Sequence, residues 1–198
     1  MTRNASTSTL LIAFIIGTFF NLPVFAANQP SLPTNSISAT ADKGVLSLDG
    51  KIHYLEDTDA LYSVDDILAG HYYGNYKTTP ATFNKGMTTS AFWFVQPFHN
   101  PSASKNIRRL LEISYPPLDN VDVYVISSNG TREVMQTGDS KPFNVRPKQD
   151  SSYLFPISFA ANEKKLVLIR VKSEGSVRVP IKLWEPTHYE ETNQIGRA

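Results

Sequence analysis

Residues 110–140 read LLEISYPPLDNVDVYVISSNGTREVMQTGDS, and this stretch decides the fold. Apolar and polar residues alternate before and after Pro116-Pro117, as in strands that have one buried and one outer face. Pro116 and Pro117 lack the backbone N–H that a strand ladder needs, so the chain turns there. Residues 127–130 (SSNG) form a turn signal of the kind that joins two hairpin strands. A strand, a rigid corner, a strand and a hairpin in this order predict a β-sandwich.

The rest of the chain repeats this pattern of short strands. Further strands are expected at residues 44–48, 51–55, 91–98, 133–137, 153–159, 165–171 and 177–184. Strands spaced in this way are typical of an all-β sandwich or jelly roll. One short helix is expected near 64–69, because Ser63 can cap it, Asp66 completes the cap and Gly70 can end it. Pro97 predicts an edge position or an irregularity in its strand.

The composition limits the function classes. With 198 residues the chain is long enough for one domain with a sizeable core. The formal net charge is +1, and the sequence contains no basic block or stripe, so nucleic acid is not an expected partner. The sequence contains no cysteine, which excludes disulfides, thiolate metal sites and a cysteine nucleophile.

The N-terminal segment predicts export. Arg3 precedes an apolar run that is too short to span a bilayer, and small residues near Ala26 suit a signal peptidase. We therefore expect a signal peptide at 1–26 and a periplasmic location. The expected organisation continues with a flexible lead-in at 27–43, a sandwich domain at 44–186, and a tail or junction to a membrane segment at 187–198.

Several short motifs follow one another along the chain. They are YLED at 54–57, SVDD at 63–66, SAFW at 90–93 with NP at 100–101, LEISYP at 111–116 with LDNVDVY at 118–124, TGDS at 137–140 with PF at 142–143 and RP at 146–147, FPI at 155–157, and RVKSEGS at 170–176 with Pro180 and Leu183-Trp184. In this order, the motifs resemble those of the extracellular domain 2 of bacterial seven-transmembrane receptors with diverse intracellular signalling modules (7TMR-DISM). Val95 and Gln96 depart from the family pattern, so the resemblance leaves the facing of that strand open.

The resemblance implies a jelly-roll sandwich similar to carbohydrate-binding modules. Such a domain would lie in the periplasm as the extracytoplasmic part of an inner-membrane receptor. It would report a small ligand, such as a carbohydrate, through seven membrane helices to a diguanylate cyclase or a histidine kinase. Two alternatives remain. One is a free-standing periplasmic carbohydrate-binding module, and the other is a protein-interaction module that contacts a partner or forms a homodimer.

Alternation also predicts candidate ligand-binding residues. If the apolar residues of three strands face the core, their polar neighbours point outward from one sheet. These are Glu112, Asp122, Tyr124, Arg170 and Lys172, and Arg178 and Lys182 could join them. Carboxylates, cations and a phenol on a curved sheet suit a hydroxylated or zwitterionic ligand. The alternative is a solvated outer face with weak cross-strand ion pairs.

Two further side chains are candidate ligand contacts. Trp93 could stack on a sugar ring, although its neighbours Phe92 and Phe94 favour burial. Trp184 is assigned to packing or to the junction with a membrane segment. Arg146 lies between prolines in a long loop, where its guanidinium could clamp a carboxylate or hold the loop to the sandwich.

The acidic loop that follows the second expected strand is a candidate calcium site. Asp57 and Asp59 supply the oxygen ligands that calcium prefers, although no EF-hand spacing is present. No other cofactor is expected. The GDS sequence at 138–140 resembles a hydrolase nucleophile motif, but it lies in a mid-chain loop without the strand–turn–helix context that such chemistry needs. We therefore expect no enzymatic activity.

Overall fold

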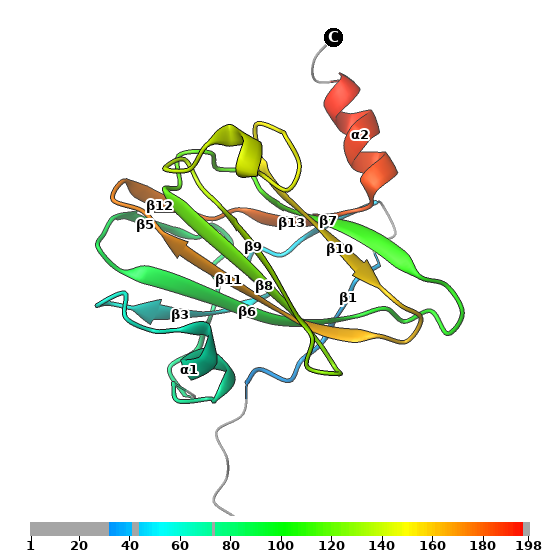
Figure 1. The fold of residues 1–198 in the computed structure, drawn as a ribbon, viewed down its shortest axis with the longest axis horizontal. Coiled ribbons are helices and arrows are strands. Elements are labelled where there is room, and N and C mark those ends of the chain that lie inside the picture. Colours follow the sequence, from blue (N-terminus) through cyan, green and yellow to red (C-terminus); the bar gives the residue numbers. More distant parts are fainter. Residues whose placement is uncertain (1–31, 41–43, 73, 196–198) are drawn as a thin grey trace, which may run out of the picture.

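Two antiparallel sheets packed face to face form the molecule (Figure 1). The computed structural model describes residues 32–40, 44–72 and 74–195. Sheet A has the order β4 (Lys77–Thr78), β3 (His53–Asp57), β6 (Ala91–His99), β11 (Lys164–Lys172), β8 (Asn120–Ser127) and β9 (Arg132–Thr137), and β1 (Ile37–Ser38) pairs with β6 in parallel. Sheet B has the order β10 (Tyr153–Phe159), β7 (Ile107–Ile113), β13 (Ile181–Trp184) and β2 (Val45–Ser47). A small third sheet pairs β12 (Ser176–Arg178) with β5 (Asn84–Met87).

The chain crosses repeatedly between the two main sheets, and the predicted jelly-roll β-sandwich is confirmed. The Pro116-Pro117 corner carries the chain from β7 in sheet B to β8 in sheet A. The turn at 127–130 then joins β8 and β9 as an antiparallel hairpin, closed by the bond from Ser127 N to Thr131 O at 2.9 Å. Later crossings insert β11 between β6 and β8, and β13 between β7 and β2.

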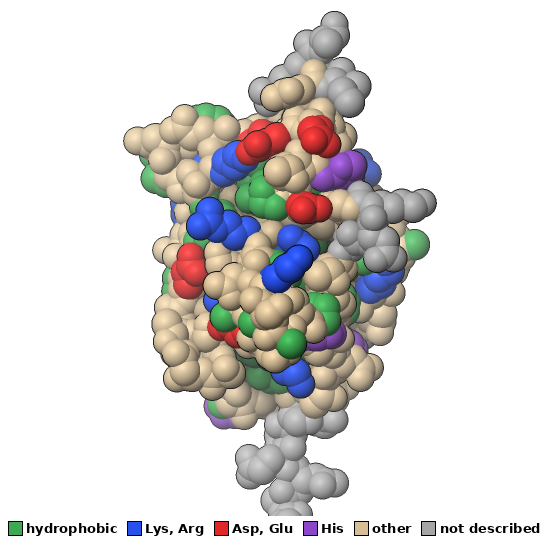
Figure 2. Space-filling model, turned by 90° about the vertical axis from the view of Figure 1, so that its right-hand side faces the viewer, with side chains coloured by type: hydrophobic (Ala, Val, Ile, Leu, Met, Phe, Trp, Pro, Cys, Tyr) green, Lys and Arg blue, Asp and Glu red, His purple; other side chains and the backbone are tan. Residues whose placement is uncertain are grey.

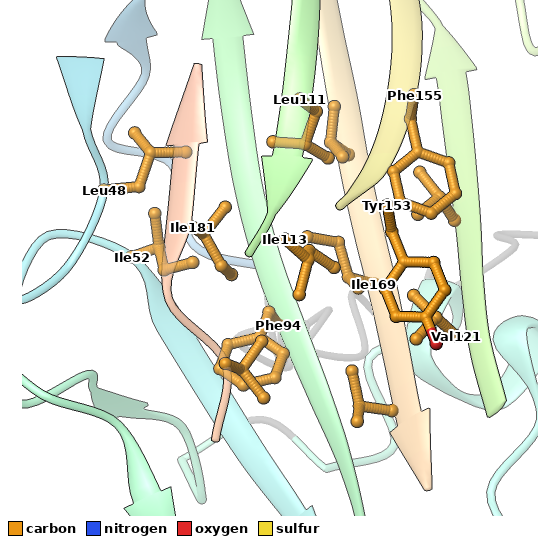
Figure 3. Close-up of a cluster of buried hydrophobic side chains, with 14 of the residues drawn as sticks. Leu48, Ile52, Phe94, Leu111, Ile113, Val121, Tyr153, Phe155, Ile169 and Ile181 are labelled. Carbon is orange, nitrogen blue, oxygen red and sulfur yellow. The ribbon is translucent and has the colours of Figure 1, made fainter. Parts of the chain in front are cut away.

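The core lies between the inner faces of sheets A and B. Figure 3 shows side chains from both sheets meeting there. Sheet A contributes Phe94, Val121 and Ile169, and sheet B contributes Leu111, Ile113, Tyr153, Phe155 and Ile181. Every one of these side chains is at most 3% exposed. Since burial of apolar area stabilises by about 25 cal/mol per Å², this layer is the main source of stability.

The outer face of sheet A is also buried over part of its area. Helix α1 (Val64–Leu68) and the loop before it pack there, so that Ile67 contacts the layer formed by Leu55, Trp93, Val95 and Leu168. The predicted cap is present: the Ser63 hydroxyl accepts from Asp66 N, and the Asp66 carboxylate accepts from Ser63 N. Gly70 ends the helix with a φ of 75°.

The facing of β6, which the family resemblance leaves open, follows from this second layer. Phe92, Phe94 and Phe98 point into the core, whereas Trp93 and Val95 point outward beneath α1. Pro97 predicts an edge position or an irregularity, and the first of these alternatives is wrong, because β6 lies between β11 on one side and β3 and β1 on the other. Pro97 does mark an irregularity, since the pairing with β3 ends at Val95 and the pairing with β1 begins at Phe98.

The structure differs from the expected organisation at both ends of the sandwich. In the expected lead-in, Asn35 O accepts from Gln96 Nε2 at 2.7 Å, β1 pairs with β6, and Ala39 is buried. In the expected tail, helix α2 (Pro186–Ile195) packs its Tyr189 onto the outer face of sheet B. Both segments contain few large apolar residues, so the sequence gives no signal that they pack on the sandwich. The expected signal peptide at 1–26 lies outside the described residues.

Candidate functional site

Four of the predicted ligand-binding residues meet on the outer face of sheet A. Arg170 in β11 pairs with Trp93 in β6 on one side and with Asp122 in β8 on the other. Tyr124 lies two residues beyond Asp122 and faces the same way. The three strands are neighbours in the sheet, so alternation along each one brings these side chains together. We call this set, with Lys172, the outer strip.

Asp122 is the electrostatic centre of the outer strip. Its carboxylate accepts from Gln136 Nε2 at 3.1 Å and lies 3.5 Å from Lys141 Nζ and 4.0 Å from Arg170 Nη1. Arg170 Nη2 also donates to Ala60 O at 3.3 Å, which ties the loop before α1 to the strip. Arg170 and Asp122 retain 18% and 11% of their side-chain exposure, so a ligand can still reach both groups.

Trp93 lies at the buried end of the outer strip. The indole is fully covered, and the Tyr124 ring stacks on it with a centroid separation of 6.0 Å. The Arg170 guanidinium carbon lies 5.8 Å from the Trp93 ring. Burial, with a smaller contribution from the Asp122 charge, raises the pKa of Tyr124, which keeps its hydroxyl protonated and able to donate. In this conformation Trp93 supports the strip from below and offers no face to a ligand.

The outer strip ends in two hollows at the end of β11. Both are lined by Lys172, Ser173 and Glu174. A hollow of about 520 Å³ is completed by Met87, Thr88 and Thr89, and a hollow of about 300 Å³ is completed by Asp119, Asn120 and Ser140. We call these the Lys172 hollows. Their volumes fall in the range of small-molecule sites. Alternation places Lys172 on the outer face, but the loops that complete the hollows carry no periodic signal.

Glu112 does not belong to this site, and its expected place beside Asp122 is wrong. β7 lies in sheet B, so Glu112 points outward from the opposite side of the molecule. There its carboxylate is buried and accepts from Trp184 Nε1 at 2.7 Å and from Ser152 Oγ at 2.9 Å. Lys182 pairs with it across β13, and Arg178 lies in β12 of the third sheet. Trp184 packs beneath α2, as assigned.

Arg146 holds its own loop together. It follows the short 3-10 helix η1 (Phe143–Val145), and its guanidinium carbon lies 4.7 Å from the Phe143 ring and 4.6 Å from the Tyr153 ring. Its Nη1 donates to Asp150 O at 2.6 Å. Of the two uses that the sequence suggests for Arg146, these contacts favour the structural one.

The acidic loop is organised by backbone hydrogen bonds. Asp57 is fully buried, and its carboxylate accepts from Leu61 N at 3.0 Å and from Tyr62 N at 2.9 Å. Asp59 is exposed nearby. Within residues 32–40, 44–72 and 74–195, His, Asp and Glu side chains form no group of three that could hold a metal ion. These contacts give Asp57 a structural role and give no support to the expected calcium site.

We expect the Asp57→Asn substitution to destabilise the protein by about 1–2 kcal/mol. Asparagine keeps one acceptor, but its amide nitrogen would face one of the two backbone N–H groups that the carboxylate now accepts from. Urea-induced unfolding measures the change. The loss should be the same with added calcium as with a chelator. A wild-type midpoint that rises with calcium and falls to the mutant value with a chelator would instead make Asp57 a metal ligand.

A third cavity lies between the N-terminal segment and sheet A. It has a volume of about 340 Å³ and is lined by Leu32, Pro33, Thr34, Asn35, His53, Gly74 and Tyr76. Among the described residues, the buried Tyr76 hydroxyl and the His53 Nδ1 atom have no hydrogen-bond partner. Burial raises the pKa of Tyr76 to about 12. The phenol is therefore neutral at physiological pH.

We expect the Tyr76→Phe substitution to leave the stability unchanged or to raise it by about 1 kcal/mol. The change removes a buried hydroxyl for which the described residues offer no partner, and it keeps the ring in its packing. Thermal unfolding of the variant beside Tyr62→Phe, which alters a hydroxyl elsewhere in the same layer, provides the comparison. A drop of several degrees in Tyr76→Phe alone would show that the hydroxyl has a partner in solution.

The fold and the outer strip define a β-sandwich with a partly buried cluster of charged and polar side chains on the outer face of sheet A. The sequence profile of the family 7TMR-DISM extracellular 2 matches residues 49–185, and the chain belongs to this family. Its members are extracellular sensor domains of membrane receptors rather than enzymes, so the domain works outside the cytoplasm. Among the described residues, no helix combines the length and the apolar character needed to cross a membrane.

Comparison with individual proteins adds little to the family assignment. No curated protein matches the sequence. A family GH115 4-O-methyl-α-glucuronidase, BtGH115A, with specificity for decorated arabinogalactans, is similar over 74% of this chain and 18% of its own, with 14% identity and a TM-score of 0.32. The enzymatically active domain of tailspike protein 4 from bacteriophage CBA120 has 7% identity over 71% of this chain and 18% of its own, with a TM-score of 0.29. A carbohydrate-binding module of the β-sandwich superfamily has 9% identity over 73% of this chain and 56% of its own, with a TM-score of 0.27. The chain thus spans less than two thirds of each of these proteins.

Proposed function

We propose that this domain senses a small polar ligand in the periplasm, as part of a bacterial membrane receptor whose output is a diguanylate cyclase or a histidine kinase. The ligand is hydroxylated, such as a carbohydrate, or zwitterionic. The single observation that carries the proposal is the outer strip. Charged and polar side chains from neighbouring strands converge on one face of sheet A and lead into the Lys172 hollows.

The distribution of charge elsewhere supports this location. Figure 2 shows the end of the molecule that faces right in Figure 1, away from β5 and β12. Lys, Arg, Asp, Glu and hydrophobic side chains are interspersed there. The outer strip differs from such a surface because its charged side chains adjoin hollows of ligand size.

Signalling requires that the ligand favour one conformation over another. The described contacts connect the outer strip to one part of the structure that a ligand would shift, namely α1 and the loop before it. Arg170 connects the strip to the loop before α1 through Ala60 O, and Arg132 Nη2 in β9 donates to Asp65 in α1 at 2.6 Å. A ligand that draws Arg170 toward itself would change how this loop and helix sit on sheet A. On the opposite face, β13 leads directly into α2 and is the natural route for output.

A thermal-shift screen against neutral sugars, carboxylates, amino acids and calcium tests the proposal. A ligand at 100 times its Kd stabilises by about 2.7 kcal/mol, which corresponds to roughly 5–10 °C for a domain of this size. The Lys172→Met variant should lose most of the shift, whereas Lys105→Met, which alters an exposed lysine between β6 and β7, should keep it. Absence of a shift with every class of compound would contradict the sensor function. An undiminished shift in Lys172→Met would place the site elsewhere.

A further inference from the structure

The Lys172 hollows carry two charged groups that the fold does not use. Lys172 is the last residue of β11, and it pairs with Asn120 on one side and with Ala91 on the other. Its ammonium makes no hydrogen bond or ion pair with the described residues. Lys172 is half-buried. Glu174, two residues further along, is exposed, and its carboxylate is likewise unpaired within the described part of the chain. Both residues line both hollows.

The backbone beneath these two groups is fixed, although their side chains are free. Asp119 Oδ2 accepts from Glu174 N at 2.7 Å and from Ser173 Oγ at 3.0 Å. Ser140 Oγ in turn donates to Asp119 O at 2.5 Å. These bonds hold the turn after β11 against the corner before β8, so Lys172 and Glu174 start from defined positions. A ligand that engages both therefore orders only two side chains, which lowers the entropic cost of binding.

The larger hollow adds an apolar surface. Met87 is 81% exposed, so its side chain is open to a ligand, and Thr88 and Thr89 lie beside it. Methionine is a flexible side chain that adapts to apolar ligand groups. One end of the hollow thus carries opposite charges, and the other offers a soft apolar contact.

These observations, together with the proposed sensor function on which this step rests, select a class of ligand. We propose that the Lys172 hollows bind a free α-amino acid with an apolar side chain. The Lys172 ammonium pairs with the ligand carboxylate, Glu174 pairs with the ligand ammonium, and the ligand side chain lies against Met87. The hydroxyls of a neutral sugar can hydrogen-bond to both groups, but they leave both charges without a counter-charge. A zwitterion satisfies both, through charge-assisted hydrogen bonds.

Isothermal titration of the protein with L-leucine and three analogues tests this assignment. N-acetyl-L-leucine lacks the ammonium, L-leucinamide lacks the carboxylate, and glycine lacks the apolar side chain. We expect L-leucine to bind at least roughly tenfold more tightly than each analogue, as the loss of one charge-assisted contact implies. Glu174→Gln should weaken L-leucine at least tenfold without affecting N-acetyl-L-leucine. Lys172→Met should weaken L-leucine to the same extent without affecting L-leucinamide.

Matched variants and a sugar separate the outcomes. Lys105→Met and Glu191→Gln alter exposed groups remote from the hollows and should bind L-leucine as the wild type does. A response to D-glucose with none to L-leucine would overturn the amino-acid assignment and leave the sensor proposal standing. A response to neither, nor to any compound of the wider screen, would overturn both. Binding of L-leucine that both hollow variants retain would overturn the assignment to this site.

Discussion

Replacing Gly138 by alanine is expected to destabilise the protein by about 4 kcal/mol, a large share of the 5–15 kcal/mol of a typical domain. Gly138 has a φ of 145°, in a region of backbone conformation that is open to glycine alone. A Cβ atom at this position would lie 2.0 Å from Asp119 O and 2.6 Å from Asp119 C. These are backbone atoms of the corner before β8, and they cannot move aside without breaking the bond from Asp139 N to Leu118 O.

Gly130 provides the matched control for this substitution. It also has a positive φ, of 83°, but a Cβ atom there would meet nothing within 4 Å. Gly130→Ala should therefore lose only about 1 kcal/mol, the cost of the left-handed conformation itself. Urea-induced unfolding of the two variants separates the cost of the backbone conformation from the cost of the clash between Cβ and Asp119. Equal losses of stability in the two variants would show that the corner before β8 shifts to accommodate the Cβ atom, and that the close approach at Gly138 does not stabilise the fold.

The sequence predicts most of the longer strands. The strand at 153–159 is predicted with its observed bounds, and β6 and β11 differ from expectation by a residue at one or both ends. Alternation and turn residues are local signals, and they suffice where each strand has one buried face. They fail for β1, β4 and β5, which have at most four residues and bury little apolar surface. β1 and β4 each pair with a longer neighbouring strand, whereas β5 pairs with β12, which has only three residues.

For the candidate site, the sequence predicts only which side chains of each strand face outward. Alternation places Asp122, Tyr124 and Arg170 outward, and the register of β8 and β11 brings them together. The same reasoning groups Glu112 with them, because alternation says which side of a strand faces out but not which sheet contains the strand. The contributions of Lys141 and Ala60 come from loops, whose positions depend on tertiary packing. No periodic pattern in the sequence carries that information.

Trp93 shows what happens when both faces of a strand are buried. Its neighbours Phe92 and Phe94 fill the core, so a two-layer sandwich would leave Trp93 on the solvent side, where a sugar could stack on it. The structure instead covers that side with α1 and the aromatic residues around it. Tyr62 and Tyr72 stack with a centroid separation of 3.6 Å in this covering layer. A helix of five residues signals its caps in the sequence, but it does not signal the surface on which it lies.

We expect the Trp93→Ala substitution to destabilise the protein by about 4 kcal/mol, since removal of a buried tryptophan leaves a large cavity. For a domain of this size the melting temperature should fall by roughly 8–16 °C. Trp93→Phe keeps an aromatic ring against Tyr124 and Ile67 and should lose only about 1–2 kcal/mol. Thermal unfolding of both variants gives these values.

Ligand binding by the same two variants decides between the two roles that the sequence allows for Trp93. As a support beneath Arg170 and Tyr124, Trp93 should affect binding in proportion to its effect on stability, so that Trp93→Phe binds nearly as the wild type does. As a stacking platform, it should lose binding in Trp93→Ala while the melting temperature stays close to that of the wild type. The second result would require α1 to move away from sheet A in solution, because the indole is fully covered in the structure. The covering layer would then be the part of the sensor that moves.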